Sequence, residues 1–164
     1  MISITEKTLQ DLEFNTVLET IASRCNTDIG EEKAMAIMPF KNKEELLINL
    51  KQTSEYLSSF SNNNAIPNHG FENINYELKF LAIEDSFLEV GSFKKISNLS
   101  ETAITLIQFL KKFEDYYPNL YQKASQIDIV KLIIQRIDEV VDKFGIIKDN
   151  ASPDLVDIRR NINV

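Results

Sequence analysis

The chain has 164 residues, 43% of them hydrophobic and 26% charged, which is enough for one globular domain with a buried core. Its net charge of −7 argues against strong nucleic-acid binding by this segment alone, because phosphate binding requires a basic surface. One cysteine excludes an internal disulfide, and one histidine leaves no histidine-rich metal site. Four glycines and four prolines are few, which favours an all-α fold over a turn-rich β sandwich.

Targeting signals are absent from the sequence. No apolar run approaches the length that spans a bilayer. The amino terminus also lacks the charged and apolar regions of a signal peptide. We therefore expect a cytoplasmic protein with no membrane partner, in which the single Cys25 is a small packing residue at the end of a helix.

The first forty residues predict short helices. Apolar residues recur at helical spacing, with an interruption near residues 13–14 and with Asn15 as the N-cap of the second piece. Thr27 or Asp28 begins the next helix, in which Gly30 lies in the first turn and permits close approach by a neighbour.

A longer helix is predicted from Asn42 to about Phe60. Asn42 and Glu45 have the spacing of a capping box, and an apolar stripe follows. The stripe is Leu46, Leu50, Leu57 and Phe60. Residues 61–70 are polar and contain a proline and a glycine, so they form a loop, although one too short to imply a domain boundary.

The centre of the fold is predicted to be a helix over Ser92–Phe113. Apolar residues occupy much of its circumference, which indicates burial on several sides, and its length would be about 30 Å. A short helix at about 73–82, with Ile74, Leu78 and Leu81 on one face, precedes it. Pro118 begins a short aromatic helix, and the last full helix runs from about 128 to 144.

The last twenty residues are the most informative. A short strand is predicted near 146–148, followed by a helix whose start is set by Ser152 as cap and Pro153 at the first position. Leu155 and Ile158 begin an apolar stripe on this helix. No stop signal follows, so we expect the chain to be the beginning of something longer.

Both ends of the sequence resemble one family. Ala151-Ser-Pro-Asp-Leu155, followed by Ile158 and two arginines, resembles the start of the long lever helix of MutS-family proteins, in particular their second bacterial type. The opening resembles the same subfamily, whose core domain starts at the initiator methionine. The matching opening residues are Thr8-Leu9, Leu12-Glu13-Phe14, Val17-Leu18 and the helix containing Gly30.

The resemblance implies an organisation and a role. Residues 1–151 would be a compact helical core domain, and 152–164 the first turns of a truncated lever helix. Ser152 and Pro153 would set the start of the lever, and Leu155 and Ile158 would dock it to the core. The segment would couple ATP hydrolysis to a DNA clamp mechanically, with the remainder of its own chain as its partner and with no catalysis, cofactor or metal of its own.

The same resemblance describes the parent protein. It would be a homodimeric, DNA-dependent ATPase that uses ATP and Mg²⁺ and acts on unusual or branched DNA. Such proteins are associated with restraint of recombination and with ribosome rescue, and many end in an endonuclease domain. The segment itself is expected to be monomeric and to bind DNA weakly. Arg159 and Arg160 are weak candidates for lying near DNA, because surface exposure and pairing with Asp157 or another acid is the favoured interpretation.

The sequence gives less support to other classes of function. Neither a G-x-x-x-x-G-K-[ST] loop nor a dinucleotide fingerprint occurs, which argues against catalysis by this segment. A carboxylate metalloenzyme needs Glu-x-x-His pairs, which are also absent. A stand-alone acidic helical adaptor fits the composition equally well. The native gene beyond Val164 discriminates, because a downstream P-loop favours the ATPase and a stop codon favours the adaptor.

Overall fold

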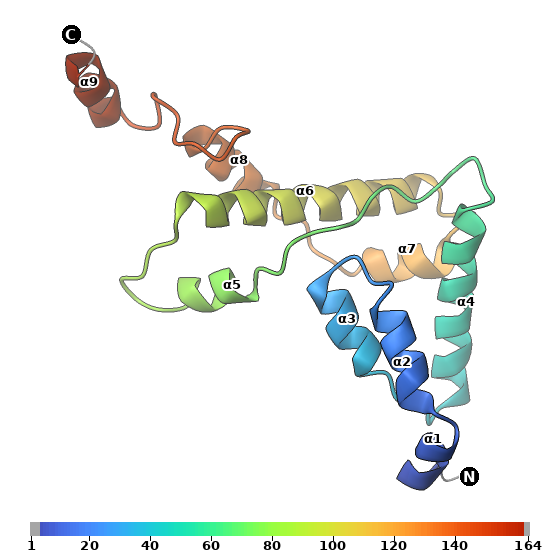
Figure 1. Ribbon diagram of the computed structural model, residues 1–164. Helices are drawn as coiled ribbons and strands as arrows, with labels where there is room; N and C mark the ends of the chain where they lie inside the picture. Colours follow the sequence, from blue (N-terminus) through green and yellow to red (C-terminus); the bar gives the residue numbers. More distant parts are fainter. Residues whose placement is uncertain (1–3, 163–164) are drawn as a thin grey trace. The chain divides into compact units, whose positions relative to one another are not determined.

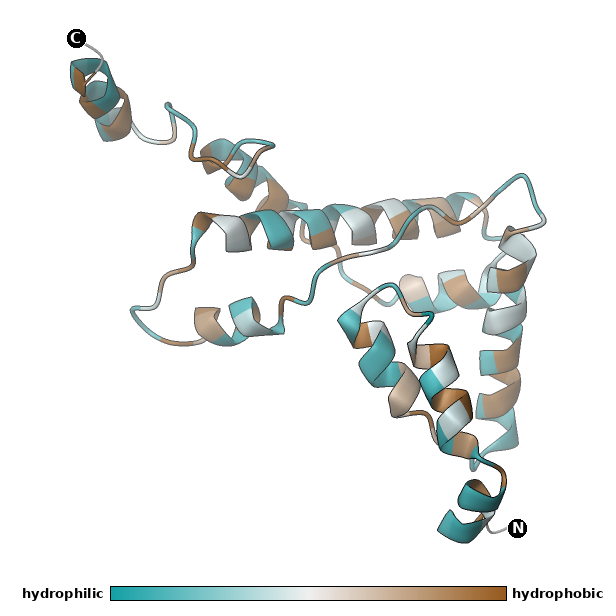
Figure 2. Cartoon of the chain, viewed as in Figure 1, coloured by the Kyte–Doolittle hydropathy of each residue, from teal (hydrophilic) through white to brown (hydrophobic). Residues whose placement is uncertain are grey.

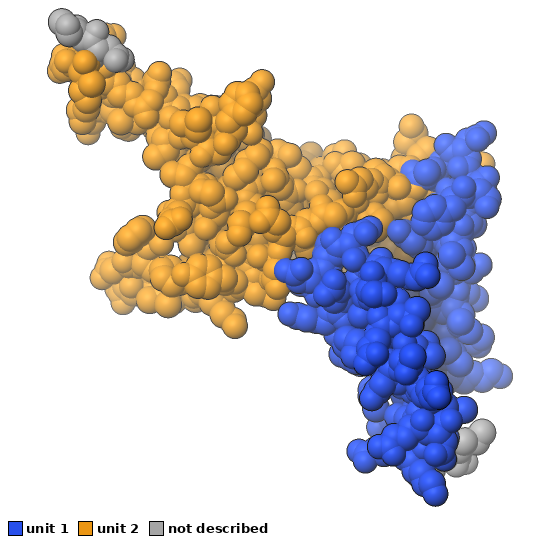
Figure 3. All heavy atoms as spheres, in the orientation of Figure 1, with its two compact units in different colours: residues 1–65 blue, residues 66–164 orange. Residues whose placement is uncertain are grey.

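The computed structural model describes residues 4–162, and these residues form nine helices and no named strand (Figure 1). The all-α prediction is therefore confirmed. The chain divides into two compact units, Met1–Ala65 and Ile66–Val164 (Figure 3). The division falls inside the loop predicted at 61–70, which the sequence pattern did not mark as a boundary.

Within its described residues, unit 1 contains four helices, two of which form a packed pair. Its helices are α1 (Glu6–Asp11), α2 (Phe14–Ala22), α3 (Asp28–Met35) and α4 (Lys43–Ser59). Helix α2 packs against α3, and Leu18 and Ala34 are buried. The predicted interruption before α2 is present, but Asn15 is not the cap. Glu13 takes that place in a left-handed conformation with φ 51°, and no side chain caps the helix.

Side-chain caps begin α3 and α4. Thr27, one of the two predicted starts, is the cap of α3, and its Oγ1 accepts a hydrogen bond from Gly30 N at 3.1 Å. A Cβ on Gly30 would lie 3.0 Å from that Oγ1 and 3.3 Å from Cys25 Cβ, so the absence of a side chain there permits the close approach. Asn42 Oδ1 accepts from Glu44 N at 2.8 Å and from Glu45 N at 3.4 Å. These bonds satisfy backbone donors that helix starts leave free.

Unit 2 is organised around α6. Its helices are α5 (Asn75–Leu81), α6 (Val90–Lys112), α7 (Pro118–Ala124), α8 (Lys131–Val140) and α9 (Pro153–Ile162). Helices α7 and α8 both pack against α6 (Figure 1). The predicted central helix is confirmed, with a start two residues earlier than expected. No helix within residues 4–162 combines the length and the apolar character needed to cross a membrane.

Two apolar clusters lie along α6. The first is Ile74, Ile96, Ile137 and Val141, and the second is Leu110, Tyr117 and Ala124. The predicted apolar face of α5 is only partly correct. Ile74 is buried just before that helix, whereas Leu78 and Leu81 are exposed and Glu77 is the buried residue of α5.

Helix α8 is shorter than the predicted 128–144. Val141 leaves the helical conformation, with φ −112° and ψ 138°, and forms a single antiparallel bridge with Ile147. The strand predicted near 146–148 is thus one bridge and not a strand. Asp142 explains the early end of α8, because its Oδ1 accepts hydrogen bonds from Phe144 N and Ile146 N, each at 2.9 Å. Such local bonds favour a turn over a continuing helix.

Candidate functional site

The start of α9 is the candidate site, and it is held through a turn that we call the 141–148 turn. Val141 lies at its beginning, buried in the cluster on α6. Asp142 N donates to Ile146 O, and Lys148 N donates to Val140 O, both at 2.8 Å. Gly145 has φ +79°, a left-handed backbone conformation that residues other than glycine rarely adopt. The turn is therefore a locally hydrogen-bonded structure that begins in the core of unit 2.

The cap of α9 uses the residues that the sequence singled out. Ser152 Oγ accepts a hydrogen bond from Leu155 N at 3.2 Å, and α9 begins at Pro153. Proline at the first helical position loses no hydrogen bond, since that N–H has no partner within the helix. Asp154 lies in the first turn, where its charge suits the positive end of the helix dipole. Three consecutive residues, Ser152, Pro153 and Asp154, thus fix where α9 begins.

Arg159 connects α9 back to the 141–148 turn and to Asp149, the residue that follows this turn. Its guanidinium forms an ion pair with Asp149, and Nη2 donates to Ile147 O at 3.5 Å. Ile147 is the residue that bridges to Val141. Pairing with Asp149, rather than with Asp157, makes Arg159 an internal connector between two segments ten residues apart.

The other predicted site residues lie in different environments. Arg160 is exposed and has no ion pair within residues 4–162. Leu155 is half-buried, whereas Ile158 is 55% exposed. No residue of α9 is fully buried, so docking of this helix through Leu155 and Ile158 stays a prediction. The last two residues of the predicted 152–164 segment, 163–164, lie outside the described part of the chain.

A polar cluster between α5 and α6 was not predicted. Lys95 Nζ lies 3.4 Å from Glu72 Oε2 and 3.6 Å from Glu77 Oε1. The side chain of Glu77 is 4% exposed, and its Oε2 has no hydrogen-bond partner among the described residues. The hydrogen bond and charge of Glu72, with the charge of Glu77, raise the pKa of Lys95 above its ordinary value. Glu77 follows the core residue Ile74 by three positions, and that spacing is the sequence signal that would place it inward.

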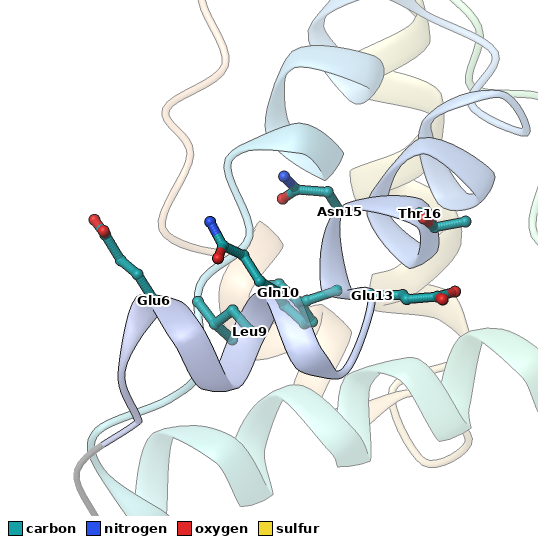
Figure 4. Close-up of a pocket in the computed structure, with 7 residues that line it drawn as sticks. Glu6, Leu9, Gln10, Glu13, Asn15 and Thr16 are labelled. Atoms are coloured by element: carbon teal, nitrogen blue, oxygen red, sulfur yellow. The ribbon is translucent and has the colours of Figure 1, made fainter.

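The α1–α2 junction has a hollow that offers little chemistry (Figure 4). It is lined by Glu6, Leu9, Gln10, Glu13, Phe14, Asn15 and Thr16. Figure 4 shows Glu13 and Thr16 pointing to one side of the two helices, and Gln10 and Asn15 pointing to another. Because these polar side chains do not converge, the hollow has no arrangement for acid–base catalysis.

Metal-binding and histidine chemistry are also without a site in the described residues. No group of three or more His, Cys, Asp or Glu side chains in residues 4–162 could hold a metal ion. His69 lies half-buried in the loop, with Nδ1 3.1 Å from Pro67 O. Cys25 is a half-buried free thiol whose Sγ lies 3.5 Å from Ile21 O. Both residues have local structural contacts.

Comparison with known proteins gives relatives but no family match. No protein-family model matches the chain. The chain is 29% identical over 160 residues to the protein named Endonuclease MutS2 of Alkaliphilus oremlandii, a match covering 96% of this chain and 20% of that protein. It is 26% identical to the Endonuclease MutS2 of Pelotomaculum thermopropionicum and 27% identical to that of Staphylococcus aureus strain MRSA252, again over 96% of this chain. These matches cover 20% and 21% of those relatives.

These similarities support a relationship to the MutS2 proteins. They extend across almost the whole chain, including the start of α9, rather than resting on one short motif. The chain spans about a fifth of the length of the relatives that it matches.

Proposed function

We propose that this chain is the amino-terminal core and the first turns of the lever helix of a MutS2-like, DNA-acting ATPase. The observation that carries the proposal is the match to proteins named Endonuclease MutS2 over 96% of the chain. The proposed division places the core at 1–151 and the lever from 152 onward. The capped start of α9 at Pro153 supports that position for the beginning of the lever.

The proposed role is mechanical. Tightly packed helices resist deformation, because protein interiors have the density of organic crystals. Two buried clusters lie along α6, and the second of these includes the fully buried Tyr117. A helix that is fixed to such a unit can transmit a rotation as rigid-body motion. Residues 149–152 separate α9 from the end of the 141–148 turn, and that turn is anchored in the first cluster, which suits this role.

DNA, ATP and Mg²⁺ belong to the proposed full-length protein. The net charge of −7 disfavours strong DNA binding by this segment, so we assign contact with branched or unusual DNA to other parts of the parent. The parent is proposed to be a cytoplasmic homodimer, and the isolated segment a monomer. Recombination restraint and ribosome rescue are the two proposed biological settings.

Two measurements test this proposal. The first is the sequence of the native gene downstream of the Val164 codon, where we expect an open reading frame containing G-x-x-x-x-G-K-[ST]. The second is ATP hydrolysis by the purified 164-residue chain, where we expect no turnover above the background of the buffer.

Either of two results would overturn the proposal. A native stop codon directly after Val164 would favour the stand-alone acidic adaptor. ATP turnover that copurifies with the 164-residue chain, and that persists in a second preparation made with a different affinity tag, would show catalysis where we propose none.

A further inference from the structure

We propose that Arg159 is an ionic latch that fixes the direction in which α9 leaves the 141–148 turn, and that high ionic strength opens this latch. The proposal goes beyond the proposed function, because it concerns a conformational equilibrium within unit 2. It can hold or fail without any DNA, nucleotide or further part of the parent.

The argument begins with how α9 is attached. The chain enters α9 through residues 149–152, where Ala151 N donates to Lys148 O at 3.1 Å. One covalent connection of this kind fixes where a helix starts but leaves its direction free to vary. A second attachment further along the helix removes that freedom. Arg159 supplies it, because it is the seventh residue of α9 and bonds back to Asp149 and Ile147.

The acceptors that Arg159 reaches are themselves anchored. Ile147 is bridged to Val141, a buried member of the cluster that includes Ile96 of α6. Lys148 adds a second tie, because its Nζ donates to Asp138 O at the end of α8. The guanidinium therefore connects α9 to a part of the turn that is continuous with the core of unit 2.

The ion pair that forms the latch is weak, so the latch can open and close. The side chain of Arg159 is 39% exposed and that of Asp149 is 81% exposed, so water and salt screen their attraction. No residue of α9 is fully buried, so little apolar packing holds the helix once the ion pair opens. Exposed ion pairs change an equilibrium by roughly twofold to fivefold. A latch of this size can be opened by salt, whereas a buried apolar contact cannot.

Pulsed electron–electron resonance on the full 164-residue chain tests the latch. Nitroxide labels would be placed at Asn98→Cys on α6 and Asn161→Cys on α9, both exposed positions, in a Cys25→Ala background. We expect a distance distribution dominated by a narrow component at about 0.05 M salt. That component should lose weight relative to the broad one by about twofold to fivefold at about 1 M salt, where the Debye length falls to roughly 3 Å.

Matched variants assign the effect to Arg159. Arg159→Gln should give the broad distribution at both salt concentrations, whereas Arg160→Gln, an exposed neighbour on the same helix, should behave as the unsubstituted chain does. The charge swap Arg159→Glu with Asp149→Arg should restore the narrow distribution. Circular dichroism checks that each variant keeps its helix content.

Three outcomes would overturn the proposal. Arg159→Gln could leave the distribution narrow, Arg160→Gln could broaden it as much as Arg159→Gln does, or the charge swap could fail to restore it. None of these outcomes bears on whether the parent is a MutS2-like ATPase, since all are measured on the isolated chain.

Discussion

Helices α4 and α6 share an apolar pattern but differ in what surrounds them. Both are long, and both carry apolar residues at helical spacing, as Figure 2 shows by its brown bands along each helix. Helix α6 buries Ile96 and Leu110 within its own unit, where α7 and α8 pack against it. The apolar stripe of α4 is exposed, and Leu57 is 60% accessible. Helical periodicity therefore predicts that an apolar stripe exists, but not which neighbour covers it.

The largest expected effect in this comparison is at Tyr117, which is fully buried beside Leu110 and Ala124. Tyr117→Ala should lower the free energy of unfolding by about 3–5 kcal/mol, because it removes a large aromatic side chain and leaves a cavity. Urea unfolding followed by circular dichroism measures this loss. Tyr116→Ala is the matched control, because that neighbouring ring is 57% exposed. Equal losses for the two variants would contradict the described packing.

The same substitution, leucine to alanine, can be made on α6 and on α4 to compare the two helices directly. Leu110→Ala on α6 should destabilise the chain by about 3 kcal/mol, since the side chain is buried. Leu57→Ala on α4 should cost under about 1 kcal/mol, because substitutions at exposed positions have small effects. Denaturant titrations of both variants measure the difference. If Leu57→Ala were as damaging as Leu110→Ala, the α4 stripe would be covered in solution.

The buried carboxylate on α5 sharpens the description of the α6 surroundings. Glu77→Met should leave stability unchanged or raise it by up to about 2 kcal/mol, because it removes a buried charge with an unpartnered oxygen. Lys95→Met should lower the melting temperature, because Glu77 then loses its cation. The opposite ranking of these two variants in thermal melts would show that the cluster stabilises the fold through Glu77.

The cluster also sets a dependence on pH. The pKa of Lys95 is raised in the folded chain by its hydrogen bond and ion pairs, chiefly with Glu72. Its contribution to stability is therefore fully present below the pKa of lysine in the unfolded chain, and is lost as pH rises through the higher folded value. Melting temperatures of the unsubstituted chain should fall more steeply in that alkaline range than those of Lys95→Met. Parallel curves of melting temperature against pH for the two chains would show that Lys95 does not cause the alkaline loss of stability.

Ser152→Ala gives a smaller expected effect, of about 1 kcal/mol, because it removes the cap of α9. Since no residue of α9 is fully buried, the loss should appear in local opening rather than in global unfolding. Hydrogen exchange should accelerate at the amides of Leu155 and Val156. Asn161→Ala, which leaves the cap intact, should not accelerate exchange there, and equal acceleration would refute the capping role.

Much of the fold follows from local sequence signals. Thr27, Asn42, Pro118 and Ser152 predict the starts of four helices, because caps and first-turn prolines act within a few residues. The length of α8 was overestimated because its apolar periodicity continues past Val140. Competition from the Asp142 side chain, which bonds to two backbone N–H groups of the turn, is not visible in that periodicity.

The site was predictable only in part. Ser152 and Pro153 act locally, so their positions at the start of α9 follow from the sequence. The pairing of Arg159 with Asp149 depends on the geometry of the intervening turn, whereas the sequence alone indicates the nearer Asp157 or another acid. Glu77 was missed because a single acidic residue in a short helix is normally exposed.

The most direct test of the proposed mechanical role uses the proposed full-length parent protein. Two glycines inserted between Asn150 and Ala151 would separate α9 from the 141–148 turn, and the matched control is the same insertion between Asn62 and Asn63 in the loop after α4. The measurement is ATP hydrolysis with and without branched DNA. We predict that the first insertion keeps the basal rate and abolishes stimulation by DNA, while the control keeps both. Full stimulation by DNA after the first insertion would contradict the account.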